Sequence, residues 1–211
     1  MATIGKAQLR ARLLAARRGV AESERAAEAR LLNEHLETAV SGVGTVCAYV
    51  PMGTEPGSVA MLDTLLRLSG RVLVPVARTA ADDTPLPLRW GEYRPGSLTR
   101  ARWGLLEPPA PLLPASELAE AELVLVPALA VDRGGVRLGR GAGFYDRSLD
   151  ACGPLTRLVA VVRDDEFLEQ LPAEPHDVRM THALTPRGGL VALFRGGCDG
   201  ECHTSRGGSS T

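Results

Sequence analysis

The sequence predicts an α/β domain in which a mostly parallel sheet is covered on both faces. Two observations predict it. Short runs of apolar residues alternate with amphipathic segments of helical period, and glycine or proline closes most of them. The central runs are apolar on both faces, which is typical of parallel strands buried between two layers. A chain of 211 residues, 45% of them hydrophobic, suits one compact domain.

Amphipathic segments predict the helices. In the first of them, Leu9, Leu13 and Leu14 form an apolar stripe. Lys6 and Arg10 lie four residues apart on a different, cationic face of the same helix. The predicted helices cover residues 4–18, 22–40 and 58–70, and a further helix is expected to begin within residues 144–152.

Apolar runs predict the strands, and the most strongly apolar run covers residues 122–132. Residues 94–116, rich in proline and glycine, are expected to form an ordered loop. We expect the domain to cover residues 1–195 and the glycine- and serine-rich residues 196–211 to be disordered. The other predicted strands cover residues 45–51, 71–77 and 157–163, with an edge strand within 88–93 and closing segments at 179–186 and 190–194.

Composition argues against some classes of function. A net charge of −1 gives no reason to expect binding to nucleic acid or to a membrane surface. No run reaches the roughly 18 apolar residues that a membrane helix needs. The four cysteines are too dispersed for a disulfide framework, so a reducing cytoplasm is expected. The arginine-rich, acid-poor N-terminus leaves a transit peptide as an alternative.

The segment RLGRGAGFYDR, residues 137–147, follows the most apolar strand and has the composition of a phosphate-binding loop. Its glycines let backbone N–H groups approach phosphate oxygens, and a helix starting behind them would add the positive end of its dipole. Arg137 and Arg140 add charge suited to polyphosphate. Asp146, directly behind the glycines, could hold Mg²⁺ against phosphate oxygens. The segment therefore predicts a site for a nucleotide or another polyanion.

Less specific interpretations of these residues stay open. The segment lacks the Lys-Ser/Thr of a Walker A loop and the glycine spacing of a dinucleotide fingerprint, so a glycine-rich turn with solvated arginines is the alternative. Asp146 is then an acidic residue stabilised by a helix N-terminus. Lys6 and Arg10 are then ordinary surface charge on a helix.

Three further features are candidates for a site. Glu55 follows the carboxyl end of a predicted strand, where open α/β sheets place ligands, although a solvated loop glutamate is the alternative. Trp103 could stack on a planar ligand or anchor its loop in the core. Cys198, Cys202 and His203 are metal-ligand residue types, but they have no fourth ligand and no scaffold around them.

Five motifs between residues 5 and 194 carry a resemblance. The most specific is ELVLVPALAVDRGGVRLGRGAGFYDRSL, which keeps the register of a strand followed by RLGYGGGYYDR, with Ala142 and Phe144 as departures. The others are KAQLR at residues 6–10, YVPMGTEP at 49–56, WGLLEP at 103–108 and His176-Asp177-Val178-Arg179. Together these motifs resemble the 5-formyltetrahydrofolate cyclo-ligase family, also called methenyltetrahydrofolate synthetase.

The resemblance implies a fold and roles for residues. The fold is a single three-layer α/β/α domain of the NagB, RpiA and CoA transferase type. Lys6, Arg10 and Arg140 are implied to be catalytic, and Asp146 and Asp177 to bind Mg²⁺. ATP is implied to contact Lys6, Arg10, Arg137, Leu138, Gly139, Arg140, Gly141, Ala142, Gly143, Phe144 and Tyr145, and the folate to contact Val50, Glu55, Arg140, Gly141, Ala142, Gly143 and Phe144.

The implied reaction converts 5-formyltetrahydrofolate, with or without a polyglutamate tail, into 5,10-methenyltetrahydrofolate, ADP and phosphate. The formyl oxygen takes the γ-phosphoryl group of MgATP, N10 of the folate closes on the activated carbon, and phosphate leaves. Cations and backbone donors placed in advance would stabilise the charge of phosphoryl transfer. A cytoplasmic monomer without nucleic-acid or membrane partners is expected.

Two other classes of function stay open. One is a non-catalytic folate- or nucleotide-binding relative, against which the presence of Lys6, Arg10, Asp146 and Asp177 argues, because a pure folate binder needs no triphosphate clamp. The other is an enzyme that acts on sugar phosphates or coenzyme A esters on a similar sheet.

Overall fold

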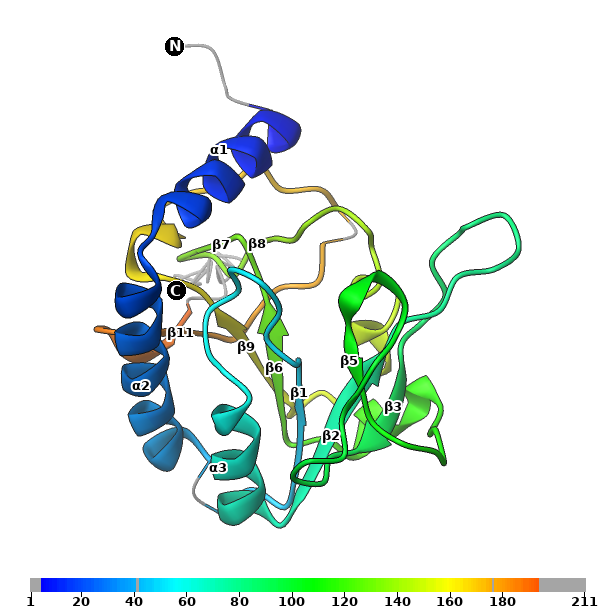
Figure 1. The fold of residues 1–211 in the computed structure, drawn as a ribbon. Coiled ribbons are helices and arrows are strands. Elements are labelled where there is room, and N and C mark those ends of the chain that lie inside the picture. The colour runs from blue at the N-terminus through cyan, green and yellow to red at the C-terminus, as the bar shows by residue number, and fades with distance from the viewer. Residues whose placement is uncertain (1–4, 41, 176, 194–211) are drawn as a thin grey trace, which may run out of the picture.

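A seven-stranded sheet forms the centre of the computed structural model, which describes residues 5–40, 42–175 and 177–193 (Figure 1). Its strand order is β12-β11-β9-β6-β1-β2-β3, and only the pairs β2–β3 and β11–β12 are antiparallel. The predicted mostly parallel sheet is therefore confirmed. Its strands are β1 (Thr45–Ala48), β2 (Arg71–Val76), β3 (Arg89–Glu92), β6 (Leu123–Pro127), β9 (Arg157–Val161), β11 (His182–Thr185) and β12 (Gly189–Ala192).

Alternate residues of the central strands point to two different cores, as the pleat of a strand requires. On one face, helices α2 (Glu22–Ala39) and α3 (Ala60–Ser69) pack on the sheet, with Leu36 and Leu65 in the same buried cluster as Val46. Helix α1 (Lys6–Gly19) lies apart from them, at the end of the molecule near β7 and β8 (Figure 1). All three helices were predicted, and their positions agree with the amphipathic pattern.

The second face is covered by short 3₁₀ helices and loops. Leu118 of η2 (Ala115–Glu120) and Leu149 of η3 (Leu149–Ala151) share a buried cluster with Cys47 and Val124 of the sheet. The helix expected to begin within residues 144–152 is a prediction that the structure contradicts. Those residues form tight turns and only the three residues of η3, because most of their local backbone hydrogen bonds run three residues back, as in turns and 3₁₀ helices, for example from Ser148 to Tyr145 and from Ala151 to Ser148.

The apolar run at residues 122–132 is two strands and not one. β6 ends at Pro127, which lacks the N–H that a longer ladder needs, and the chain then bends into β7 (Ala130–Asp132). β7 belongs to a small sheet, β10-β7-β8, with β10 (Phe167–Leu168) and β8 (Arg137–Leu138). Since β8 leads directly into residues 139–147, this small sheet positions the glycine-rich segment.

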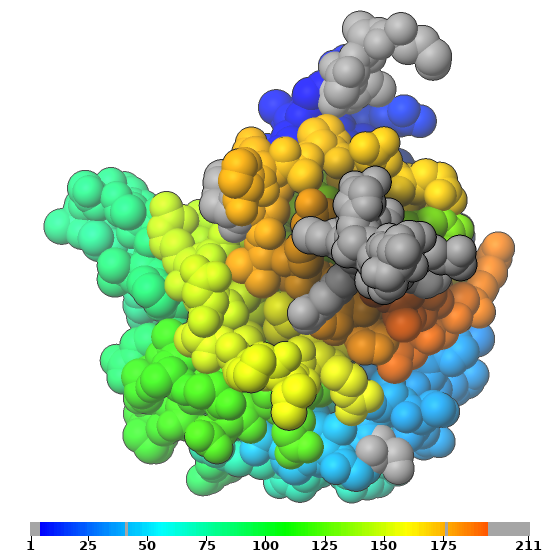
Figure 2. All heavy atoms as spheres, turned by 180° about the vertical axis from the view of Figure 1, so that it is seen from behind, coloured from blue at the N-terminus to red at the C-terminus, as the bar shows by residue number. Residues whose placement is uncertain are grey.

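The predicted loop at residues 94–116 contains short regular elements: β4 (Thr99–Arg100), η1 (Arg102–Gly104) and β5 (Leu106–Glu107), while η4 (Asp164–Glu166) precedes β10. Residues near 80–85 project from the molecule in both views (Figure 1, Figure 2).

Within the described part of the chain, no helix is long and apolar enough to cross a membrane. The predicted tail, with Cys198, Cys202 and His203, lies outside the described residues, as does His176.

Candidate active site

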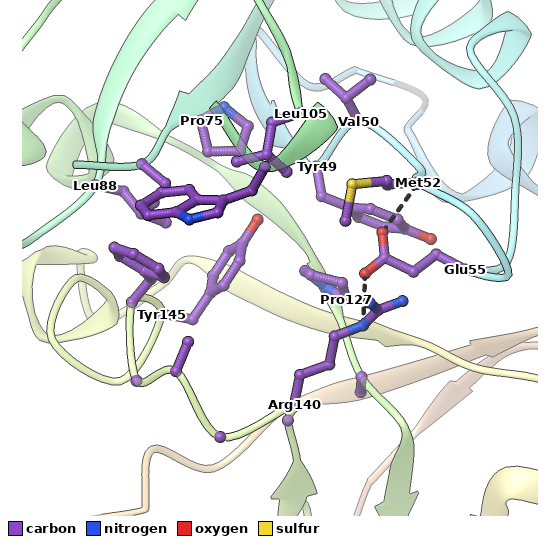
Figure 3. A pocket seen from close by; sticks show the side chains of 18 of the residues that line it. Tyr49, Val50, Met52, Glu55, Pro75, Leu88, Leu105, Pro127, Arg140 and Tyr145 are labelled. Atoms are coloured by element: carbon purple, nitrogen blue, oxygen red, sulfur yellow. Dashed lines mark hydrogen bonds and ion pairs between the residues drawn. The ribbon is translucent and has the colours of Figure 1, made fainter. Parts of the chain in front are cut away.

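A cavity of about 310 Å³ opens at the carboxyl ends of β1, β2 and β6, the edge where α/β sheets bind ligands (Figure 3). The segment after β1 contributes Val50 and Glu55, and Pro127 marks the end of β6. Residues 137–147, here called the glycine loop, form the opposite wall, and every residue from Gly139 to Asp146 lines the cavity. Val50 and Glu55, which the resemblance implied for the folate, therefore share one cavity with the glycine loop, whereas Lys6 and Arg10 are not among its lining residues.

Two glycines of the glycine loop have backbone conformations that other residues rarely adopt. Gly141 has φ +98° and Gly143 has φ +78°. A Cβ on Gly143 would also lie 2.4 Å from the Arg147 guanidinium. The carbonyl of Gly139 accepts a hydrogen bond of 3.0 Å from Arg10 Nε, so α1 holds the start of the loop.

Arg137 has open hydrogen-bonding capacity inside the site. Its side chain is 5% exposed and its Nη2 donates to Asp146, while Nε and Nη1 have no partner among the described residues. Burial lowers the pKa of Arg137 in spite of the Asp146 carboxylate. The buried Tyr145 hydroxyl is likewise without a described partner, and burial raises its pKa. Unpaired buried donors are costly, so these groups are candidates for contacts with a ligand.

Glu55 and Arg140 meet across the cavity. Arg140 Nε lies 3.2 Å from one carboxylate oxygen of Glu55, and the other oxygen accepts a 3.0 Å hydrogen bond from the Met52 amide (Figure 3). The Glu55 side chain is only 11% exposed, and burial raises its pKa although Arg140 opposes that shift. Glu55 is thus a desolvated carboxylate and not the solvated loop residue of the alternative interpretation.

Lys6 lies outside the cavity wall and is held by two carboxylates. Its Nζ is 3.1 Å from Asp177 and 3.1 Å from Glu174. Burial acts to lower the pKa of Lys6, but the hydrogen bonds with Asp177 and Glu174 outweigh it and raise the pKa. Lys6 precedes Arg10 by one turn of α1, and Arg10 Nε donates to the Gly139 carbonyl, so the Lys6–Asp177 pair lies at the end of α1 that contacts the glycine loop.

The two predicted magnesium ligands are each paired with a cation. Asp146 binds Arg137 and Asp177 binds Lys6. The described residues contain no group of three or more His, Cys, Asp or Glu side chains that could hold a metal ion. An all-protein metal cage is therefore not found in this part of the chain, whereas Mg²⁺ shared with phosphate oxygens needs only one or two carboxylates.

Trp103 stands at the mouth of the cavity. It is 49% exposed, so the alternative in which it anchors its loop in the core is wrong. Its φ is +59°, its ring centroid is 6.3 Å from that of Phe144, and the Arg102 guanidinium lies over its ring. Held in this way, the indole can cover a planar ligand.

Some cavity residues carry no sequence signal. Leu88, Leu105 and Pro75 form an apolar wall, and in the sequence they look like ordinary core residues. Conversely, Leu138 was assigned to the nucleotide but is buried in the cluster that packs against α1, away from the cavity. Its backbone, as part of β8, sets where the glycine loop begins.

Comparisons with known proteins identify the family of this chain. The model of the 5-formyltetrahydrofolate cyclo-ligase family matches residues 2–186. The 5-formyltetrahydrofolate cyclo-ligase of Mycolicibacterium smegmatis is 58% identical over 193 residues, which cover 92% of this chain and 100% of that protein. The Escherichia coli K12 protein of the same name is 30% identical over 144 residues, covering 67% of this chain and 78% of that protein.

Solved structures show the same fold at low sequence identity. The 5,10-methenyltetrahydrofolate synthetase of Aquifex aeolicus superposes with a TM-score of 0.68 at 22% identity, over 96% of this chain and 99% of that one. The synthetase of Mycoplasma pneumoniae gives a TM-score of 0.64 at 19% identity, over 84% and 96% of the two chains. With the family model matching almost the whole described chain, the protein belongs to the 5-formyltetrahydrofolate cyclo-ligase family.

Proposed function

We propose that this chain catalyses the ATP- and Mg²⁺-dependent conversion of 5-formyltetrahydrofolate into 5,10-methenyltetrahydrofolate, with release of ADP and phosphate. The observation that carries the proposal concerns Arg137. Its side chain is buried, two of its guanidinium nitrogens have no partner among the described residues, and it lines the same cavity as Glu55. One cavity therefore offers anion donors on one side and a carboxylate acceptor with apolar walls on the other.

The folate half is supported by the chemistry of the wall around Glu55. A pterin ring is planar and carries N–H donors, which match a desolvated carboxylate flanked by apolar side chains. Val50 and Phe144 line the cavity, and Trp103 lies over its mouth. Ligand pockets of this class combine apolar walls with a few placed polar groups.

The triphosphate half is supported by the donors around the glycine loop. Arg137 offers Nε and Nη1, the positive-φ glycines expose backbone, and Arg10 lies within 4 Å of the side of Gly141 that a Cβ would occupy. ATP supplies the phosphoryl group that turns the formyl oxygen into a leaving group. Arg137, Arg10, Arg140 and Lys6 would bind the phosphates and stabilise the charge that spreads over them in phosphoryl transfer.

No protein nucleophile is needed for this reaction, because the formyl oxygen of the folate attacks the γ-phosphoryl group directly. Among the described residues that line the cavity there is no serine, cysteine or histidine. Cys47 lies in the core and burial raises the pKa of its thiol, while the pKa of Cys152 is raised by burial to about 11. Both thiols are therefore protonated at neutral pH and poor nucleophiles.

Asp146 and Asp177 are the residues that would hold Mg²⁺, as the family's pattern implies. Carboxylate oxygens are the ligands that Mg²⁺ prefers, usually one or two of them together with phosphate oxygens and water. Each aspartate binds a cation, Arg137 or Lys6, that would itself bind phosphate in the proposed reaction. Binding of the anionic nucleotide would draw these cations to it and free the carboxylates for the metal.

The proposal is tested by mixing the chain with 5-formyltetrahydrofolate, ATP and Mg²⁺ and following the absorbance band of the methenyl product. We expect product and phosphate only when all three are present. Binding of both ligands without product would support the non-catalytic relative. Phosphate release that does not require the folate would instead indicate an enzyme for another substrate, such as a sugar phosphate or coenzyme A ester.

A further inference from the structure

The Arg140 side chain spans the two halves of the candidate site. Its backbone lies in the glycine loop between Gly139, whose carbonyl accepts the Arg10 Nε–H, and Gly141, where a Cβ would be 3.7 Å from Arg10 Cζ. Its guanidinium lies at Glu55, on the opposite wall (Figure 3). The Arg140 backbone therefore lies among the proposed triphosphate donors, while its guanidinium pairs with Glu55, the carboxylate proposed to bind the folate.

Each carboxylate oxygen of Glu55 already has a partner in this state, so a ligand that donates to the oxygen paired with Arg140 competes with Arg140 for it. One carboxylate oxygen accepts the Met52 N–H and the other pairs with Arg140. A ligand that donates N–H groups to Glu55 can displace Arg140, because it supplies the hydrogen bonds that a desolvated carboxylate requires. The Met52 amide cannot take over that role, since it already serves the other oxygen.

Resting on the proposed function, we propose that the Arg140–Glu55 ion pair couples the binding of the two substrates. Folate binding at Glu55 displaces Arg140, whose guanidinium then turns to the triphosphate held by its own loop. The Arg140 side chain is 40% exposed, so it can move without disrupting the core. By thermodynamic linkage, the nucleotide must then strengthen folate binding by the same factor.

The coupling is measured with ligands that cannot react. The Kd of the β,γ-imido analogue of ATP, with Mg²⁺, is determined by calorimetry with and without saturating tetrahydrofolate, which lacks the formyl group. We expect tetrahydrofolate to lower that Kd by at least about fivefold, within the usual range of coupling between sites. Equal Kd values in the two conditions would overturn the inference.

Two variants identify the ion pair as the source of the coupling. Arg140→Met keeps much of the aliphatic part of the side chain but removes the charge. The coupling factor, defined as the nucleotide Kd without tetrahydrofolate divided by the Kd with it, should therefore fall to about one. Glu55→Gln should tighten nucleotide binding in the absence of folate, because glutamine no longer holds Arg140. That gain should vanish in the double variant E55Q/R140M, as expected for residues that act through each other. A gain that persists in the double variant would contradict the inference.

Glu169→Gln is the matched control. Glu169 pairs with Arg133 at 2.8 Å on the exposed surface, so the variant removes one carboxylate from an ion pair outside the cavity. We expect its coupling factor to equal that of the wild-type chain. A wild-type chain that forms the methenyl product without coupling would overturn this inference alone, whereas a chain that binds neither ligand would overturn the proposed function as well.

Discussion

Arg137 and Asp146 form an ion pair that engages only one of the three guanidinium nitrogens of Arg137. The remaining two are buried and have no described partner, an arrangement that costs free energy unless a ligand satisfies it. The pair therefore holds the Arg137 guanidinium at the cavity with hydrogen-bonding capacity left on Nε and Nη1. A guanidinium carries five N–H donors in a fixed plane, whereas a lysine ammonium is a compact point charge.

Arg137→Lys should consequently weaken nucleotide binding while the charge is kept. Loss of hydrogen bonds to a charged group predicts a rise in the Kd of the imido ATP analogue of about tenfold to a hundredfold. Arg133→Lys is the control, because Arg133 is an exposed arginine that directly follows β7. This variant should bind the imido ATP analogue with the Kd of the wild-type chain. An unchanged Kd in Arg137→Lys would mean that its open nitrogens face water and not phosphate.

Lys6→Ala should raise the KM for ATP by about tenfold, the loss expected for one charge-assisted contact, and leave the KM for the folate nearly unchanged. Lys6 is assigned to the proposed nucleotide half because it lies one helical turn from Arg10, whose Nε donates to the Gly139 carbonyl of the glycine loop. Arg12→Ala removes an exposed charge from the same helix and serves as the control. Steady-state kinetics with each substrate varied in turn measure both KM values. An unchanged KM for ATP in Lys6→Ala would show that Lys6 does not contact the nucleotide.

Asp146→Asn should raise the Mg²⁺ concentration needed for half-maximal turnover and lower kcat, because a neutral amide is a weaker ligand for a hard cation. Mg²⁺ titrations of turnover measure both effects. Asp150→Asn, four residues further along the chain, changes an exposed aspartate and is the control. Normal activity of Asp146→Asn at low Mg²⁺ would show that Asp146 serves only to hold Arg137.

The sequence predicted the fold best where a run of one kind of residue determines the local structure. Apolar runs located the central strands, and the glycines of residues 137–147 predicted a loop, which the structure has after β8. It misled at residues 144–152, where a helix was expected to begin. There the backbone forms turns with i→i−3 hydrogen bonds, and only η3 is helical.

The contacts that make the site could not be predicted in the same way. Glu55 and Arg140 are 85 positions apart, and nothing in either motif says that their side chains meet. Leu88 and Leu105 line the cavity through tertiary placement, although each has the chemistry of a core residue. Trp103 was ambiguous because its exposure depends on a positive φ that a tryptophan rarely adopts.

Ser148 joins the two walls of the cavity and should be sensitive to substitution. Its buried hydroxyl donates to the Phe144 carbonyl at 2.7 Å and accepts the Leu88 N–H at 2.8 Å. Ser148→Ala leaves the buried Leu88 N–H unsatisfied, at a cost of about 1–3 kcal/mol. A chain of this size should lose roughly 2–4 °C in Tm for each kcal/mol, and amide exchange should accelerate in the glycine loop.

The control for Ser148 is Thr156→Val at the opposite edge of the sheet. The Thr156 hydroxyl is also buried and donates to the Ala121 carbonyl at 2.7 Å, before β6 and β9 begin. This variant should lower Tm without changing exchange in residues 137–147. Hydrogen-exchange mass spectrometry compares the two, and equal exchange of the glycine loop in both would show that Ser148 does not fix the loop.

Glu55→Gln should alter the pH dependence of stability in a defined direction. Burial raises the folded-state pKa of Glu55, so the folded chain binds its proton more tightly than the unfolded chain does. Between the ordinary pKa of glutamate and the raised pKa, the free energy of unfolding of the wild type therefore falls as pH rises. Glutamine does not titrate, so the Tm of Glu55→Gln minus that of the wild type should rise across this window and level off above it. Thermal unfolding measured from about pH 4 upward tests this. The Tm change of Glu169→Gln at each pH gives the effect of losing a surface carboxylate, which is subtracted from that of Glu55→Gln. A difference that stays flat or falls with pH would mean that Arg140 fully offsets the burial of Glu55.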